Sequence, residues 1–546
     1  MGEFAATGSQ PACGTGLVAL VETTNTPRDA IIYHSRGAVL IIADADGIDR
    51  ATEAAIRLAG SASNLKIVLC APGADRLTRS QARISYIPAR VTQLSGHLGG
   101  FFAQAPTDGD RLQNLGVFSA NTDKYFDLVL DFGSTPLLAA TEPPYGYFPV
   151  ATGAEVLERA LATIPSLIGK FSKPKYFSYD QSLCAHGEKG IKGCTRCIEA
   201  CATGAILSVG DKVSIDPYLC QGCAACAMVC PTGAVTYRHS VASPEAIRLA
   251  LSNPLATRAV LVIHGIESRP EVAAMSSLTD VRIVPLELNP AIGDNGTLWV
   301  DALNAGFLGV IVMTGPSMPL QSLSQLKRKI SDLKIVLHSL GIDPQRMAVA
   351  DTSTLATTME QIHDISSITV EHTAKEFIAN SDTHKRARWM ESLNLLSVSD
   401  ERSGIVPLPA GAEFGEVLVE IEKCTLCHAC VNLCPTSALT AGVEGNASLW
   451  FQEDRCVQCT LCAKACPEQA IQLAPRFVTD SLRRSTPRLV SEDEQALCQA
   501  CSTPFISKRL LEKSISLMRG LQVTMPAGVD SLRKCPSCRQ DETLRV

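Results

Sequence analysis

CTLCHACVNLCP, residues 424–435, decides the fold of the region around it, and the chain repeats its spacing as CVQCTLCAKACP at residues 456–467. Two-residue gaps let the backbone wrap one corner of a cubane iron–sulfur cluster and offer three thiolates to three irons. The fourth cysteine, set apart by three residues and followed by proline, ligates the neighbouring cluster. We therefore predict two [4Fe–4S] clusters. Their ligands are Cys424, Cys427, Cys430 and Cys466 for one and Cys456, Cys459, Cys462 and Cys434 for the other.

An earlier block has the same design with one irregularity. The run CQGCAACAMVCP at residues 220–231 is complete, but its partner has Ile191 where the first cysteine belongs. Cys184 is the nearest thiol, and the glycine-containing insertion AHGEKGIKG can fold back as a loop. The predicted sets are Cys184, Cys194, Cys197 and Cys230 for one cluster and Cys220, Cys223, Cys226 and Cys201 for the other. The alternatives are a three-cysteine [3Fe–4S] cluster or His186 as the fourth ligand.

All four runs continue alike after the last cysteine. At the same distance from that cysteine, each run has an alanine followed by an aliphatic residue. We expect these side chains to pack against the cluster and exclude water from it. These pairs are Ala205-Ile206, Ala234-Val235, Ala438-Leu439 and Ala470-Ile471.

The last four cysteines are spaced differently. Two CxxC pairs separated by 33 residues are typical of a tetrahedral four-thiolate site, which leaves no position open for a substrate. We predict one structural zinc ion. A rubredoxin-like iron is the alternative, although Ser502 and Arg539 replace the glycines usual after its knuckles. The predicted ligands are Cys498, Cys501, Cys535 and Cys538, which leaves only Cys13 and Cys70 outside metal sites.

Composition excludes several classes of protein. Of 546 residues, 46% are hydrophobic and 19% charged, so a mainly disordered chain is excluded. With a net charge of −6, the chain lacks the excess of basic residues that is typical of nucleic-acid-binding proteins. The longest apolar run is about half of the ~20 residues a membrane helix needs, and no basic residue precedes Arg28 as a secretory signal would require. We expect a cytoplasmic protein without a membrane span, where reduced thiols favour metal over disulfides.

Two further regions have the pattern of α/β domains. Short apolar strands alternate with helical segments, which is typical of a parallel sheet covered by helices. The strands are predicted at residues 38–43, 65–70 and 126–131 in the first region and at 259–263, 281–286 and 309–313 in the second. Corresponding strands are similar, as AVLII is to AVLVI, and each region is followed by a cysteine block. We infer a duplication of an α/β unit with its cysteine block.

The predicted fold is therefore α/β scaffold domains with parallel sheets, alternating with two bacterial 2[4Fe–4S] ferredoxin modules of α+β type, and ending in a small zinc-ribbon-like tail. The charged run KRAR within the linker is expected on a helix with a solvated face. The predicted order is a flexible segment (1–35), an N-terminal domain (36–170), module 1 (175–240), a middle domain (241–372), a helical linker (373–415), module 2 (416–475) and the zinc-binding tail (485–546).

Longer stretches resemble a narrower family. GHLGGF at 96–101, PPYGY at 143–147 and the segment from Tyr179-Asp180 to Cys184-Ala-His186 resemble bacterial cytoplasmic 4Fe–4S proteins encoded beside molybdenum or tungsten formate dehydrogenases. The resemblance implies Cys184 as a ligand, a paired-CxxC tail with Pro504-Phe505, and a formate dehydrogenase as partner. The middle domain weakly resembles the delta subunit of methyl-viologen-reducing hydrogenases. That family's cysteines are missing here, so its [2Fe–2S] centre is not implied.

These features predict an electron-transfer protein with four [4Fe–4S] clusters and one zinc, relaying electrons between redox protein partners, with no catalytic site of its own. The alternatives are a maturation factor for a molybdoenzyme and a non-catalytic subunit of a larger oxidoreductase complex.

Overall fold

The computed structural model describes residues 30–76, 83–106, 111–119, 121–138, 140–150, 153–238, 259–275, 281–288, 290–292, 296–365, 385–396, 404–442, 446–520 and 529–543. Cys13 and the rest of the predicted N-terminal segment up to residue 29 lie outside these ranges, as do residues 373–384 of the predicted linker. None of the helices within these ranges is both long and apolar enough to span a bilayer.

The N-terminal domain contains a five-stranded parallel sheet in the order β4-β3-β2-β8-β9. Side chains of successive strand residues point to opposite faces, and both faces are buried. One face packs against helices α1 (Ile48–Ser61) and α2 (Ala154–Thr163), the other against the antiparallel sheet β5-β6-β7. The parallel sheet is thus confirmed, but helices cover only one of its faces. The strands are β2 (Ala38–Ile42), β3 (Lys66–Cys70), β4 (Ile84–Ile87), β5 (Gln93–Ser95), β6 (Phe102–Pro106), β7 (Leu112–Asn114), β8 (Leu128–Asp131) and β9 (Tyr147–Pro149).

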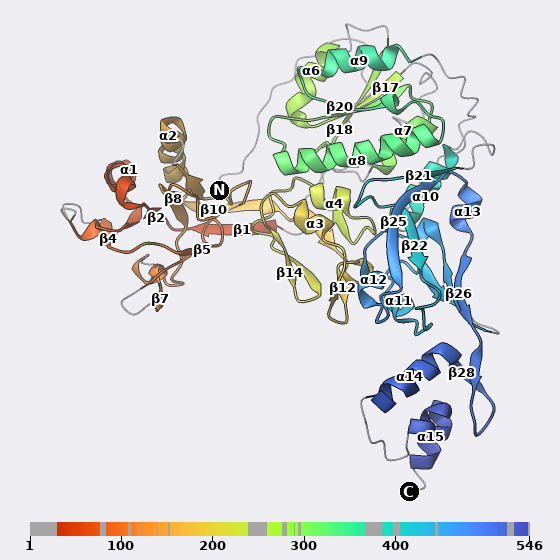
Figure 1. The fold of residues 1–546 in the computed structure, drawn as a ribbon. Coiled ribbons are helices and arrows are strands. Elements are labelled where there is room, and N and C mark those ends of the chain that lie inside the picture. Colours follow the sequence, from red (N-terminus) through yellow and green to blue (C-terminus); the bar gives the residue numbers. More distant parts are fainter. Residues whose placement is uncertain are drawn as a thin grey trace.

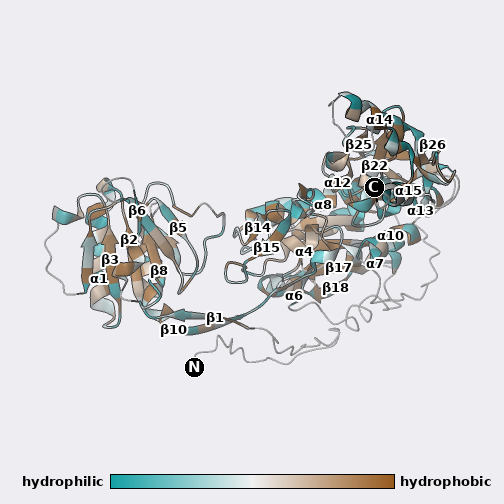
Figure 2. Cartoon of the chain, turned by 90° about the horizontal axis from the view of Figure 1, so that it is seen from below, coloured by the Kyte–Doolittle hydropathy of each residue, from teal (hydrophilic) through white to brown (hydrophobic). Residues whose placement is uncertain are grey.

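An antiparallel ribbon joins this domain to the rest of the chain. Strand β1 (Ala30–Ser35) pairs along its whole length with β10 (Gly169–Pro174). Figures 1 and 2 both show the N-terminal domain standing apart from the other units, with this ribbon leading toward module 1.

Module 1 is built from short hairpins and two short helices that carry the cysteines. Strand β11 pairs with β16, β12 with β13, and β14 with β15, all antiparallel. The elements are β11 (Phe177–Tyr179), β12 (Gly187–Glu188), β13 (Ile191–Lys192), α3 (Arg196–Glu199), β14 (Ile206–Val209), β15 (Lys212–Ile215), α4 (Ala225–Val229) and β16 (Val235–Tyr237).

The middle domain has a four-stranded parallel sheet in the order β18-β17-β19-β20. Helices α7 and α8 cover one face and α6 and α9 the other, as predicted for this domain. The central order β18-β17-β19 matches β3-β2-β8, so the strands that resemble each other in sequence occupy equivalent positions. The elements are β17 (Ala259–His264), α6 (Arg269–Met275), β18 (Arg282–Glu287), α7 (Thr297–Asn304), β19 (Gly309–Met313), α8 (Leu320–Ser339), β20 (Met347–Ala350) and α9 (Leu355–His363).

Module 2 combines two small antiparallel sheets, β21-β25-β22 and β23-β24-β26, with helices α10 to α13. Strand β26 lies within the predicted tail, yet it pairs with β24 of module 2. The elements are α10 (Lys385–Leu395), β21 (Ile405–Pro407), β22 (Gly415–Val419), α11 (Ala429–Asn432), β23 (Leu439–Ala441), β24 (Ala447–Phe451), α12 (Leu461–Ala465), β25 (Ile471–Val478), α13 (Ser481–Ser485) and β26 (Arg488–Asp493).

The end of the chain forms a separate small unit, seen at the bottom of Figure 1. It contains the hairpin β27 (Gln495–Leu497) and β28 (Pro504–Ser507), followed by α14 (Lys508–Gly520) and α15 (Pro536–Thr543). By contrast, a continuous hydrophobic core joins the middle domain to module 1 and α10, because α8 of the middle domain, α4 of module 1 and α10 share one buried cluster.

Candidate iron–sulfur and metal centres

Two cavities in module 2 are lined by the two predicted cysteine sets. The first encloses about 350 Å³ of space, partly open to solvent, and is lined by Cys424, Cys427, Cys430 and Cys466 together with His428 and Ile471. Burial and, after it, the thiols of Cys427, Cys424 and Cys466 raise the pKa of Cys430 to about 12. The structure therefore brings these four side chains together around one space.

The second cavity of module 2 encloses about 330 Å³ and is lined by Cys434, Cys456, Cys459 and Cys462. Leu439, Val417 and Leu473 complete its wall. Burial, and then the thiols of Cys456, Cys459 and Cys434, raise the pKa of Cys462. Cys434 comes from the first run and Cys466 from the second, so the fourth cysteine of each run lines the cavity formed by the other run's first three cysteines.

The complete runs have the same backbone shape. In each, the residues before and after the second cysteine adopt the left-handed conformation, which costs a non-glycine residue about 1–2 kcal/mol. Repetition of this costly conformation curls the chain so that three thiols converge. These residues are Gly222 and Ala224 (φ 80° and 61°), Leu426 and His428 (54° and 58°), and Gln458 and Thr460 (53° and 72°).

Hydrogen-bond donors point at several of the cysteine sulfurs. The Ala438 amide lies 3.2 Å from the Cys434 sulfur and the Ala470 amide 3.3 Å from the Cys466 sulfur. The Gln458 side-chain amide lies 3.4 Å from the Cys456 sulfur. Such donors stabilise thiolates, the form in which cysteine binds metal. Together with the four-thiol cavities, they fit iron–sulfur ligation. All eight residues of the alanine–aliphatic pairs are buried, as expected if they exclude water from the clusters.

In module 1, thiols of each predicted set lie close enough to shift one another's pKa. Burial, and then the thiols of Cys194, Cys230 and Cys184, raise the pKa of Cys197. Burial, and then Cys223, Cys220 and Cys201, raise the pKa of Cys226 well above its ordinary value. The insertion after Cys184 forms the hairpin β12–β13, with Lys189 and Gly190 in the left-handed conformation at its turn. Ile191 lies in β13 at the normal ligand position.

His186 is fixed by two hydrogen bonds that occupy both of its ring nitrogens. Nδ1 lies 2.8 Å from the Cys194 carbonyl oxygen and Nε2 lies 2.9 Å from the Ser208 hydroxyl. The ring is buried, so a change of partner would break one of these bonds. Between the two candidate ligands left open by the sequence, the geometry favours Cys184 because its thiol lies in the set and the imidazole is engaged elsewhere.

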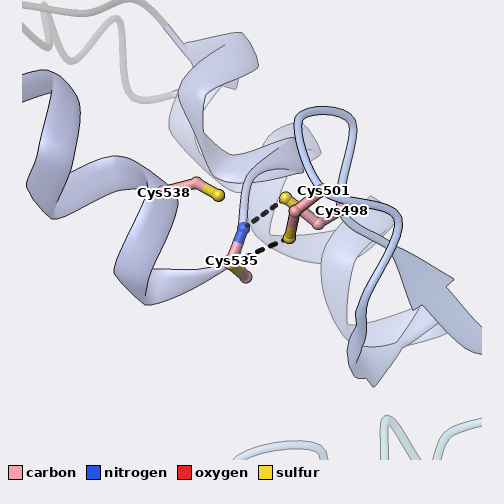
Figure 3. A group of neighbouring side chains, drawn as sticks. All are labelled: Cys498, Cys501, Cys535 and Cys538. Carbon is pink, nitrogen blue, oxygen red and sulfur yellow. Dashed lines mark hydrogen bonds between the residues drawn. The ribbon is translucent and has the colours of Figure 1, made fainter.

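The four cysteines of the tail face one another (Figure 3). All four sulfurs lie within 4.8 Å of one another, and those of Cys501 and Cys535 are 3.7 Å apart. A zinc–sulfur bond of ~2.3 Å gives a tetrahedron with edges of about 3.8 Å, so the spacing fits four-thiolate coordination.

The pKa values of these cysteines also favour a bound cation. Backbone amides, that of Cys535 foremost, lower the pKa of Cys498 to about 6. The neighbouring thiols, that of Cys501 foremost, raise the pKa of Cys538 to about 12. Four thiolates this close repel one another, and a divalent cation that replaces their protons removes the conflict. Ser502 reaches a φ of 59°, so the first knuckle turns without the glycine usual in rubredoxins.

Side chains of the β1–β10 ribbon and of the N-terminal domain lie close to the Cys220 loop, and sequence reasoning missed this. The buried Lys173 ammonium donates to the carbonyl oxygens of Tyr218 at 2.7 Å and Cys220 at 2.6 Å. It lies 5.0 Å from the ring centre of Tyr33 and 5.4 Å from that of Tyr145. Tyr145 belongs to the PPYGY segment, which therefore lies beside the lysine that holds the Cys220 loop.

Comparison with known proteins supports the same assignment at the level of the domain. The 4Fe-4S dicluster domain family matches two segments, residues 173–234 and 423–470. A search of curated proteins found no match. The chain therefore carries ferredoxin-type 4Fe-4S domains at two places, and the matched segments contain all sixteen cysteines predicted as cluster ligands, Cys184 included.

Metal analysis gives the most direct check of the ligand sets. Anaerobically purified protein is expected to contain sixteen irons, sixteen acid-labile sulfides and one zinc per chain, because each set of four cysteines accommodates one cubane and the tail one ion. About eight irons would contradict the assignment for one module. Seventeen irons without zinc would convert the tail to a rubredoxin-like site.

Proposed function

We propose that this protein is an electron carrier that holds four [4Fe–4S] clusters and relays electrons between protein partners. The observation that carries the proposal is the lining of the two module 2 cavities by the predicted four-cysteine sets. A bound cubane supplies reversible one-electron chemistry. The cysteines would bind it, the alanine–aliphatic pairs exclude water from it, and the amides of Ala438 and Ala470 stabilise the thiolates.

The proposed carrier has no substrate site of its own. Every cysteine run is used for cluster ligands, and a four-thiolate zinc in the tail leaves no open coordination position. The zinc would be structural. The partner is proposed from the family resemblance alone: a formate dehydrogenase, with electrons entering through one module and leaving through the other, in the cytoplasm.

The test is reduction of the purified protein by its proposed donor. Formate with a catalytic amount of the dehydrogenase is expected to bleach the visible iron–sulfur absorbance anaerobically, and air-free oxidant should restore it without decay. Formate alone is the control and should change nothing, because the proposed carrier has no formate site of its own.

Two outcomes would contradict the proposed electron-carrier function. In the first, the clusters stay oxidised in the presence of dehydrogenase and formate. In the second, the clusters leave the protein for an apo-acceptor during turnover. If a strain without the protein also accumulates inactive dehydrogenase lacking its metal, a role in maturation replaces electron transfer.

A further inference from the structure

The two modules touch through cysteine loops. A Cβ on Gly193 would lie 2.6 Å from the Leu461 side chain and 2.8 Å from the Cys459 carbonyl oxygen, so the two backbones meet with no room for a side chain. Arg196 donates to the Val457 carbonyl oxygen at 3.1 Å, and Lys464 donates to that of Lys192 at 2.8 Å. These contacts hold the Cys194 loop of module 1 against the Cys459 loop of module 2.

The Gly193 contact gives the order of all four sets. Gly193 precedes Cys194 of the Cys184 set, and its contact with the Cys459 carbonyl oxygen brings that set next to the Cys456 set. The Cys220 set shares module 1 with the Cys184 set, and the Cys424 set shares module 2 with the Cys456 set. The order is therefore the Cys220 set, the Cys184 set, the Cys456 set and the Cys424 set. The middle two face each other across the Gly193 contact.

Two consecutive cations of α10 lie at this contact, one beside each inner set. Lys385 donates to the carbonyl oxygen of Ala227 at 2.7 Å, within the helix that precedes Cys230. Arg386 donates to the Cys456 carbonyl oxygen at 2.8 Å. The expectation that this charged run lies on a solvated face is wrong for Arg386, which is 6% exposed. Its Nη1 is buried without a hydrogen-bond partner among the described residues.

Several cations act on one carboxylate at this contact. Glu413 is half-buried and forms an ion pair with Lys329 at 3.2 Å. Burial alone would raise the pKa of Glu413, but Lys329, Arg386, Arg196 and Lys385 lower it to about 2. Two further carboxylates lie nearby: Asp454 pairs with Arg484 at 3.2 Å, and Asp332 lies close to Glu413 and Lys329. The lowered pKa of Glu413 indicates a positive electrostatic potential among the described residues at the contact, and such a potential favours a negatively charged group there.

We infer that Lys385 and Arg386 are positioning residues that raise the reduction potentials of the two inner clusters, and that electrons pass between the modules at the Gly193–Cys459 contact. The inference rests on the proposed function, because it takes the sixteen cysteines as cluster ligands. A cubane bound by four thiolates carries net negative charge, and reduction adds more. A buried cation stabilises the reduced state more than the oxidised one, and the low dielectric strengthens the effect.

The experiment is a redox titration of full-length holoprotein, followed by electron paramagnetic resonance. Lys385→Gln is expected to shift the potential of the Cys184-set cluster downward, and Arg386→Gln that of the Cys456-set cluster. Arg386→Lys should restore the wild-type value, because it keeps the charge. Signals are assigned with Cys184→Ser and Cys456→Ser. Arg388→Gln is the matched control, since Arg388 lies on the same helix but pairs with Asp301 of the middle domain at 3.4 Å.

The outcomes separate this inference from the proposed function. Unchanged potentials in both glutamine variants, in protein that loads four clusters and cycles reversibly, would overturn the inference and leave the carrier intact. Equal shifts in the Arg388→Gln protein would also overturn it, because the effect would then be nonspecific. If Arg386→Gln fails to load its clusters, Lys385→Gln decides, since Lys385 is only partly buried.

Discussion

Replacement of Cys184 by alanine is expected to remove one iron, or one whole cubane, from module 1 and to leave the other three clusters in place. Cys184 is the one ligand outside a regular run, and Ile191 offers no replacement thiol. His186 cannot move in as a substitute without breaking its hydrogen bonds to Cys194 and Ser208. Iron should fall from sixteen per chain to fifteen or twelve, with a [3Fe–4S] resonance signal in oxidised protein in the first case.

Two further variants make this result specific. Cys70→Ala changes a fully buried thiol whose sulfur lies 3.1 Å from the Ala89 carbonyl oxygen, far from any run in sequence, and should keep sixteen irons. His186→Gln should loosen the β12–β13 hairpin but also keep sixteen irons. An unchanged iron count in Cys184→Ala together with a loss in His186→Gln would transfer the ligand role to the histidine.

The local spacing of the cysteines predicted how they would gather. A CxxCxxCxxxC run constrains its own backbone strongly, so the exchange of Cys434 and Cys466 between two cavities follows from sequence positions alone. The parallel sheets were also predictable, because β2 is apolar throughout and β17 is apolar up to its last residue, His264, as expected of strands buried on both faces.

Contacts between distant segments were not predictable in this way. The sheet β5-β6-β7 covers a face that we expected helices to cover. The sequence did not reveal this sheet because its strands are three to five residues long and leave little periodicity to detect. Arg386 looks like a surface residue in a polar segment, and only the packing of α10 against both modules buries it. In the sequence, Gly193 is only one of several glycines in an insertion. The structure shows that Leu461, 268 residues further on, occupies the space that a side chain at Gly193 would need.

Each outer cysteine set is covered by a unit that belongs to neither module. Lys173 of the β1–β10 ribbon contacts the Cys220 loop, and the N-terminal domain contacts it where Gln221 donates to the Pro143 carbonyl oxygen at 2.7 Å. At the other end, the tail reaches the Cys424 loop, where Ser507 donates to the Thr425 carbonyl oxygen at 2.6 Å. Lys513 of α14 forms an ion pair with Glu468, which lines the same cavity. The tail thus adds cover to a cavity that is partly open to solvent.

Loss of the tail zinc should consequently weaken the outer cluster of module 2. Cys535→Ser with Cys538→Ser removes two of four ligands, and zinc binding in small modules supplies about 10–16 kcal/mol of folding free energy, far more than the few buried side chains of this unit can replace. Substitution is preferable to truncation at residue 485, which would also remove β26 from the sheet of module 2.

The double variant should lack zinc, yet hold sixteen irons while oxygen is excluded, because no tail residue belongs to a cluster set. In air, the Cys424-set signal should decay first and faster than in the parent protein, since Ser507 and Lys513 no longer cover its loop. Ser537→Ala, an exposed change between the same two cysteines, is the control and should behave as the parent. Equal decay of all four signals, or loss of iron without oxygen, would show that the tail supports the whole cluster assembly and not one end of it.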